Sequence, residues 1–147
     1  TVYVVGFRRS LPVSSYLAYS LQQLNKRTIF VDGVGGLTRQ QIQTIGPSDL
    51  MIAVSFHPYA EETIQAVQTA TMHEAKVLSI SDSLVSATAK PATLALQVKE
   101  AEIRKFRSLA ATMCLAQAIV ISYAFEAQQR ELSKRAKAPA AKRRKTN

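Results

Sequence analysis

Short apolar runs alternate along the chain with longer stretches whose apolar residues recur at helical spacing. The runs have the length of strands and cover residues 2–5, 28–31, 50–54, 77–80 and 93–98. The stretch between the first two runs places four apolar residues on one helical face: Val13, Leu17, Leu21 and Leu24. Strands that read as continuous apolar runs, separated by helices, are typical of a parallel sheet buried on both faces. The pattern therefore predicts an α/β fold.

Three more helices are expected, over residues 37–45, 60–75 and from 106 to about 132. The last is apolar around much of its circumference, so we expect its outer side to pack on another subunit or on a helix upstream of this chain. Together the elements predict a three-layer α/β/α sandwich with a five-stranded parallel sheet.

The net charge of +9 is concentrated near the end of the chain. Residues 133–147 hold seven of the 19 Lys and Arg residues and no Asp or Glu, whereas residues 1–132 carry the other 12 basic residues and all 10 acidic ones, a net of +2. We therefore expect one domain over residues 1–132 and a disordered basic tail over 133–147, because the tail lacks large apolar side chains. The tail either keeps the protein soluble or contacts nucleic-acid phosphates.

Other features of the sequence narrow the function classes. Thr1 begins inside an expected strand, so we interpret the chain as a fragment of a longer protein. No apolar run approaches the roughly 18 to 20 residues of a membrane span. Cys114 is the only cysteine and is expected to be a buried thiol, which leaves no disulfide within the chain and no metal-binding cluster. We expect neither a metal nor a cofactor.

Two strand-to-helix loops are candidates for a ligand site, since open parallel sheets bind ligands at the carboxyl ends of strands, where the strand order reverses. The first loop is Gly6–Ser10. Gly6 permits a tight exit from the strand, and Arg8 and Arg9 offer guanidinium forks to a phosphate or carboxylate. Ser10 either caps the following helix or donates to an anion. The alternative is that both arginines are merely solvated.

The second loop, Ser55–Tyr59, also joins a strand to a helix. Ser55 follows the strand directly, Tyr59 offers a hydroxyl, and His57 either hydrogen-bonds a ligand or faces solvent. A third loop, Ser79–Ser83, contains Ser and Asp residues that turn formation alone explains.

Three stretches of the chain resemble the SIS (sugar isomerase) domain of RpiR-type (MurR/RpiR) bacterial transcriptional regulators: residues 2–10, 49–59 and 77–83. The resemblance implies a flavodoxin-like SIS fold that dimerises, and a helix-turn-helix domain upstream that binds DNA in the cytoplasm. It also implies that Ser10 and Ser55 hold a phosphosugar or related metabolite. Ser108 matches a further serine near the pocket.

The chain departs from the SIS pattern at both loops. The motif S-x-S-G-x-T, whose hydroxyls and amides hold phosphate in SIS enzymes, is replaced by Ser-Phe-His-Pro-Tyr-Ala at 55–60, and a glycine of the first loop is replaced by Arg8. Arg8, Arg9 and Tyr59 then rebuild the anion site, or the ligand is not a simple sugar phosphate.

These observations predict an effector-sensing domain rather than an enzyme. Its ligand would be a carbohydrate phosphate or sugar acid, which would control DNA binding by an attached domain allosterically. One alternative is a sugar-phosphate isomerase with Glu61, Glu62 or His57 as its base. Another is a module that only dimerises and binds no ligand.

Overall fold

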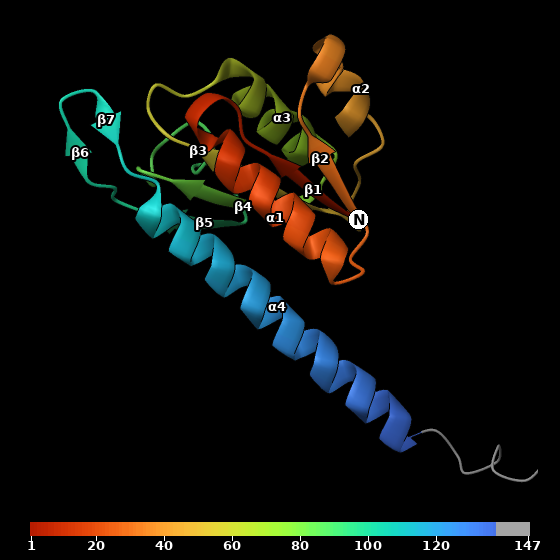
Figure 1. Cartoon of the computed structure of the whole chain (residues 1–147). Helices are drawn as coiled ribbons and strands as arrows, with labels where there is room; N and C mark the ends of the chain where they lie inside the picture. The colour runs from red at the N-terminus through yellow and green to blue at the C-terminus, as the bar shows by residue number, and fades with distance from the viewer. Residues whose placement is uncertain (138–147) are drawn as a thin grey trace, which may run out of the picture.

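A five-stranded, all-parallel sheet forms the centre of the molecule in the computed structural model, which describes residues 1–137 (Figure 1). The strands are β1 (Val2–Val5), β2 (Thr28–Val31), β3 (Leu50–Ser55), β4 (Lys76–Ser81) and β5 (Leu94–Gln97). Their spatial order is β2-β1-β3-β4-β5, the flavodoxin-like order, in which the order of strand addition reverses between β1 and β3. The predicted α/β class, five-stranded parallel sheet and strand order are confirmed.

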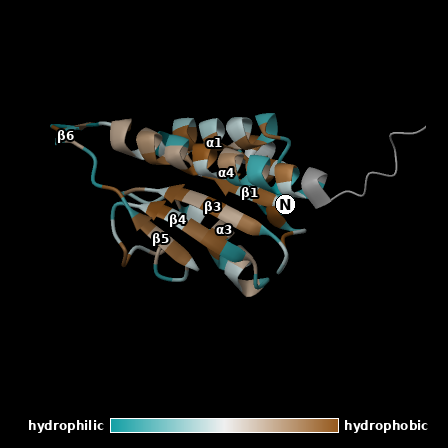
Figure 2. Ribbon diagram, turned by 90° about the horizontal axis from the view of Figure 1, so that it is seen from below, coloured by the Kyte–Doolittle hydropathy of each residue, from teal (hydrophilic) through white to brown (hydrophobic). Residues whose placement is uncertain are grey.

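Helices cover both faces of the sheet and complete the three layers. The helices are α1 (Leu11–Gln23), α2 (Thr38–Ile42), α3 (Glu61–Met72) and α4 (Ala110–Lys137), with short 3-10 turns at Arg8–Ser10 and Val34–Gly36. Helices α1 and α4 pack on one face, around a core that includes Leu17 and Ile80, while α2 and α3 pack on the other, around Met51 and Val67. Figure 2 shows the apolar strands between these helical layers. The inner strands β1, β3 and β4 are thus largely buried, which explains their continuous apolar runs, whereas the edge strands β2 and β5 are partly exposed.

A small hairpin replaces the start of the last predicted helix. Phe106–Arg107 forms β7, which pairs antiparallel with β6 (Glu102–Ile103), so the prediction of helix from residue 106 is wrong there. The helix begins only at Ala110, where residues that precede it in the chain accept hydrogen bonds from its first backbone amides. Ser108 Oγ accepts from the Ala110 amide at 3.0 Å. The Glu100 carboxylate accepts from the Thr112 amide at 2.6 Å.

Helix α4 also ends later than predicted. It runs to Lys137, so residues 133–137 of the expected disordered tail are helical instead. Glu, Lys and Arg are good helix formers, and basic side chains suit the carboxyl end of a helix dipole. The rest of that tail, residues 138–147, lies outside the described residues.

Much of α4 is exposed to solvent. Ile121, Phe125 and Leu132 are exposed, and Cys114 is exposed as well, contrary to the expected buried thiol. Residues 110–134 are long and apolar enough to cross a membrane by length and composition, which corrects the sequence-based expectation. The 18-residue window of this segment that meets the hydropathy criterion is 11% buried. The helix packs along one side through Ala116, so the apolar pattern alone did not reveal which side is covered.

Candidate functional site

The β1–α1 loop begins at Gly6, where the backbone runs close to β3 and α1. A Cβ on Gly6 would lie 3.0 Å from the Val54 carbonyl oxygen and 3.1 Å from the Ser14 side chain. Ser14 Oγ donates a 3.0 Å hydrogen bond to the Gly6 carbonyl, which ties the loop to α1. Glycine is therefore needed here for close approach, and the loop is held firmly at its base.

The next residues place two guanidinium groups and a hydroxyl at the carboxyl edge of the sheet. Arg8 has a φ of +54°, in the left-handed region, and is exposed, whereas Arg9 is half-buried. Ser10 is buried and precedes α1, but its side chain makes no capping hydrogen bond. The Ser10 side chain thus does not cap α1, which was one of the two roles expected for it.

The β3–α3 loop contributes a hydroxyl with no partner. Ser55, the last residue of β3, is only 3% exposed, and its Oγ has no hydrogen-bond partner. Buried polar groups are nearly always hydrogen-bonded, so an orphan of this kind needs an explanation. Farther along the loop His57 is exposed, its peptide bond to Pro58 is cis, and its ring meets Tyr59 edge-on at 5.8 Å.

The two loops enclose one cavity of about 210 Å³. Its lining comes from the first loop (Phe7, Arg8, Arg9 and Ser10) and from the second (Ser55, Phe56, His57, Pro58 and Ala60). Five predicted site residues meet here: Arg8, Arg9, Ser10, Ser55 and His57. Tyr59 and Ser108 are absent from this lining. The expectation that the loops after β1 and β3 lie together follows from the parallel order of the strands.

Tyr59 turns instead toward the end of β4. Its hydroxyl donates a 2.9 Å hydrogen bond to Asp82, whose other carboxylate oxygen accepts from the His57 amide at 3.1 Å. Burial raises the pKa of Tyr59 above its usual value of 10, and the hydrogen bond to Asp82 raises it further. Tyr59 therefore anchors the loop rather than lining the cavity.

Sequence reasoning missed Arg107, which joins this loop to the hairpin. Its Nη1 donates to the His57 carbonyl at 3.0 Å, and its Nη2 donates to Glu102 at 3.0 Å. It also lies 3.7 Å from an Asp82 carboxylate oxygen. The expected helix over this segment hid the residue, whereas Asp82 was signalled by its place directly after β4. Ser108 acts locally by capping α4.

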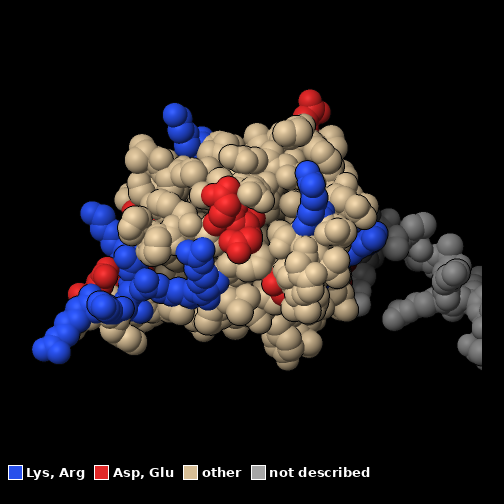
Figure 3. Space-filling view, turned by 90° about the horizontal axis from the view of Figure 1, so that it is seen from above, with Lys and Arg blue, Asp and Glu red and all other residues tan. Residues whose placement is uncertain are grey.

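Charge and metal-binding groups are distributed unevenly. On the face seen in Figure 3, Lys and Arg side chains gather toward the end that carries the hairpin, near a small patch of Asp and Glu. Within the part of the chain that the structure describes, no three His, Cys, Asp or Glu side chains are placed to hold a metal ion. The cavity thus offers guanidinium, hydroxyl and imidazole groups, which suit an anionic, hydroxyl-rich small molecule.

The architecture and the cavity define an α/β domain with a candidate ligand site at its topological switch point. The family model described as SIS domain matches residues 1–125, and the chain belongs to this family. No curated protein sequence matches the chain.

Solved structures with a fold similar to that of this chain include transcriptional regulators and sugar-phosphate isomerases. The RpiR transcription factor of Sphaerobacter thermophilus (sugar isomerase domain) is 27% identical with a TM-score of 0.80, over 90% of this chain and 74% of that one. The Vibrio vulnificus NanR protein complexed with ManNAc-6P is 20% identical with a TM-score of 0.69, over 95% and 56%. An Escherichia coli CFT073 protein in complex with a sugar phosphate is 16% identical with a TM-score of 0.68, over 91% and 71%.

These comparisons support assignment to the SIS domains of RpiR-type regulators. The chain spans just over half the length of the NanR protein and about three quarters of the Sphaerobacter one. A putative sugar-phosphate isomerase of Listeria monocytogenes has a similar fold, with 18% identity and a TM-score of 0.69 over 83% and 66% of the two chains.

Proposed function

We propose that this chain is the effector-sensing and dimerisation domain of an RpiR-type transcriptional regulator. Its ligand is a phosphosugar or related carbohydrate metabolite, bound in the cavity between the β1–α1 and β3–α3 loops. The observation that carries the proposal is the Ser55 hydroxyl, which is buried at the cavity without a partner. A hydroxyl in such a place costs stability unless a ligand satisfies it.

The charge around the cavity supports an anionic ligand. Among the described residues, the ion pairs within 4.0 Å involve neither Arg8 nor Arg9. Two guanidinium groups without carboxylate partners, next to an unsatisfied hydroxyl, favour phosphate or carboxylate oxygens. The similar NanR protein is complexed with ManNAc-6P and the similar Escherichia coli protein with another sugar phosphate, which supports this ligand class.

We favour sensing over catalysis. Aldose–ketose isomerisation needs a base near the substrate carbon. Within the cavity lining, His57 is the single side chain of a type that usually serves as that base, and it is exposed at the rim. Glu61 and Glu62 lie in the first turn of α3, where carboxylates stabilise the helix dipole. The observation in favour of the isomerase alternative is that similar structures include a putative sugar-phosphate isomerase.

The partners follow from the same proposal. The exposed apolar residues Ile121 and Phe125 of α4 support a homodimer, because large apolar side chains on a solvent-facing helix favour a protein partner. DNA would be bound in the cytoplasm by a domain outside this chain. Ligand binding would then act on DNA affinity through a change in the dimer.

The binding test uses the 147-residue chain with ManNAc-6P and arabinose 5-phosphate, measured by calorimetry and by thermal unfolding. We expect the midpoint to rise with ligand concentration, as linkage requires. Ser55→Ala is expected to raise the stability of the free protein by about 1 kcal/mol, because it removes an unsatisfied hydroxyl, and to weaken binding.

Ser86→Ala is the matched control. The Ser86 hydroxyl is also buried, but it contacts Ser81 Oγ at 3.0 Å and the Ala89 amide at 3.2 Å. Its loss should lower stability and leave affinity unchanged. Absence of binding to every sugar phosphate tried would sink the sensing proposal, and turnover of arabinose 5-phosphate by the chain would favour the isomerase alternative.

A further inference from the structure

The backbone of Arg8 is in a conformation that favours glycine, and yet the residue is an arginine. Its φ of +54° lies in the left-handed region, where a Cβ crowds the backbone. Strained residues of this kind are typical of functional sites, since the surrounding structure must hold them in place. The strain therefore raises the question of what the side chain contributes.

The other non-glycine residues with positive φ have local explanations. Asn25 and Glu74 follow the ends of α1 and α3, where a left-handed residue commonly terminates a helix. Arg104 lies in the two-residue turn between β6 and β7. Arg8 opens the 3-10 turn Arg8–Ser10 between β1 and α1, which the Ser10 amide closes by donating to the Phe7 carbonyl at 3.1 Å. That turn accounts for the left-handed backbone, which glycine would adopt more easily, but not for an arginine side chain.

The surroundings of Arg8 point to a ligand rather than to a role in folding. Its side chain is exposed, lines the cavity with Arg9, and makes no ion pair within 4.0 Å among the described residues. Ser55 lines the same cavity; it is more than nine-tenths buried, and its hydroxyl has no partner. A cation and a hydroxyl donor thus line one space that holds no carboxylate side chain.

We propose that Arg8 is the specificity-determining residue of this cavity, kept in a strained conformation so that its guanidinium binds the anionic group of the ligand. This inference rests on the proposed function and names the chemistry of its ligand. The fork recognises two oxygens of one phosphate or carboxylate group. A neutral sugar of the same size should bind far more weakly.

Four compounds separate the possible sources of the anionic group: glucose, glucose 6-phosphate, gluconate and 6-phosphogluconate. Glucose carries no anionic group, glucose 6-phosphate carries a phosphate, and gluconate carries a carboxylate. The fourth compound, 6-phosphogluconate, carries both groups. Calorimetric titration of the wild-type chain, together with ManNAc-6P, is expected to detect an anionic compound and not glucose. Stronger binding by glucose 6-phosphate than by gluconate assigns the phosphate, and the reverse assigns the carboxylate.

Variants at Arg8 separate backbone strain from binding. Arg8→Gly is expected to raise the unfolding midpoint of the free protein by about 2 °C, since glycine relieves the strain. The same variant should lower affinity for the anionic compound by roughly tenfold to a hundredfold, the worth of a charge-assisted hydrogen bond. Arg8→Asn, which also tolerates the left-handed region, should show the same loss of binding.

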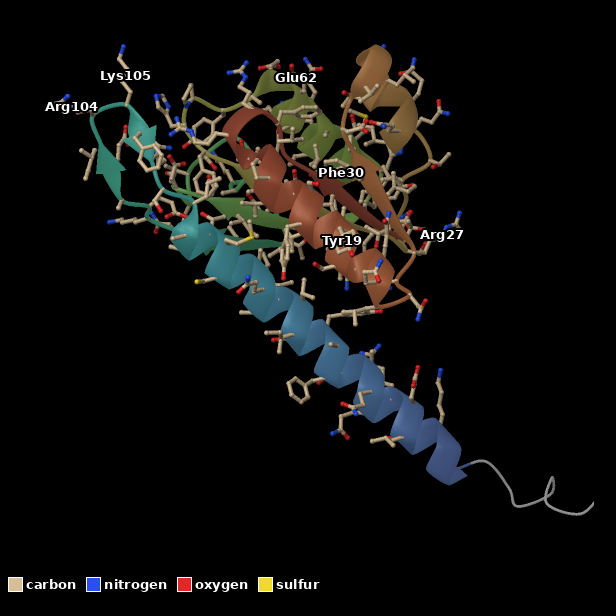
Figure 4. The ribbon with its side chains drawn as sticks, viewed as in Figure 1. Tyr19, Arg27, Phe30, Glu62, Arg104 and Lys105 are labelled. Carbon is tan, nitrogen blue, oxygen red and sulfur yellow. The ribbon has the colours of Figure 1, made fainter. Side chains whose placement is uncertain are left out.

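Arg104→Gly is the matched control. Arg104 has a φ of +57° and lies at the tip of the hairpin, where Figure 4 shows it beside Lys105, away from the body of the molecule. Its glycine variant should show a similar rise in the unfolding midpoint and bind the anionic compound as the wild type does. Wild-type affinity in both Arg8→Gly and Arg8→Asn overturns the proposal while leaving the proposed function standing. If the wild type binds none of the compounds, both fail.

Discussion

The hydroxyl of Tyr59 and the carboxylate of Asp82 lie 2.9 Å apart, although the two residues are 23 positions apart in the chain. The second oxygen of Asp82 accepts from the His57 amide at 3.1 Å. One side chain at the end of β4 therefore fixes two points of the loop after β3. That loop carries half of the cavity lining, so the shape of the cavity depends on Asp82.

Removing this carboxylate should loosen the loop. Asp82→Ala is expected to lower the free energy of unfolding by about 2 kcal/mol, because two donors lose an acceptor. Amide hydrogen exchange over residues 56–60 should rise more than elsewhere. Glu131→Ala, an exposed change on α4, serves as the control. If amide exchange in the loop after β3 is unchanged in Asp82→Ala, Asp82 does not hold that loop in place.

The raised pKa of Tyr59 predicts a loss of stability in alkali. Its pKa is higher in the folded than in the unfolded protein, so its contribution is fully present below pH 10 and disappears as pH rises through the folded value. Unfolding midpoints between about pH 8 and 11 should fall more steeply for the wild type than for Tyr59→Phe. Tyr19→Phe, at a tyrosine that is 62% exposed, should retain the wild-type slope.

Arg107 is expected to hold the hairpin against the cavity loop. Arg107→Ala removes the hydrogen bonds to the His57 carbonyl and to Glu102, and should cost about 1 to 3 kcal/mol. Exchange at the β6 and β7 amides should increase together with exchange near His57. In Lys105→Ala, at the exposed turn, neither segment should change. A response confined to the hairpin would show that the two segments are not coupled.

A substitution at Gly6 tests the packing at the base of the β1–α1 loop, and one at Gly46 is its control. Gly6→Ala brings a Cβ to 3.0 Å from the backbone oxygen of Val54 and should destabilise the fold by about 1 to 3 kcal/mol. Gly46→Ala meets nothing within 4 Å and should be neutral or stabilising by up to about 1 kcal/mol. Chemical denaturation measures both. Equal midpoints would show that β1 and β3 can separate at this edge.

The sequence predicts those parts of the fold that buried periodicity determines. Five apolar runs became five strands, and the order of a parallel sheet then brought the loops after β1 and β3 together. The hairpin was missed because Ile103 and Phe106 are both exposed, so no alternation with a buried face marked the strands. The partner of Tyr59 was missed because that contact joins loops that lie far apart in the sequence.

The exposure of Cys114 illustrates another limit. A helix that is apolar all round carries no phase that tells which side meets the sheet, so burial could not be assigned residue by residue. Ser108 was predicted near the ligand because the resemblance matches it to a serine near the pocket, and in the structure its hydroxyl accepts from the Ala110 amide at the start of α4. Short polar side chains serve either purpose, and only the surrounding backbone distinguishes them.

Helix α4 starts three residues after Arg107 and extends for 28 residues, which at 1.5 Å per residue is about 42 Å. Glu100 and Ser108 bond its first amides, and its first half packs on the core as far as Tyr123, whereas its far end projects from the domain. The part beyond Tyr123, about 14 residues, spans roughly 21 Å, so a bend of about 5° at Tyr123 moves the tip by roughly 2 Å. The packed half thus anchors the helix, and the projecting half is a short lever.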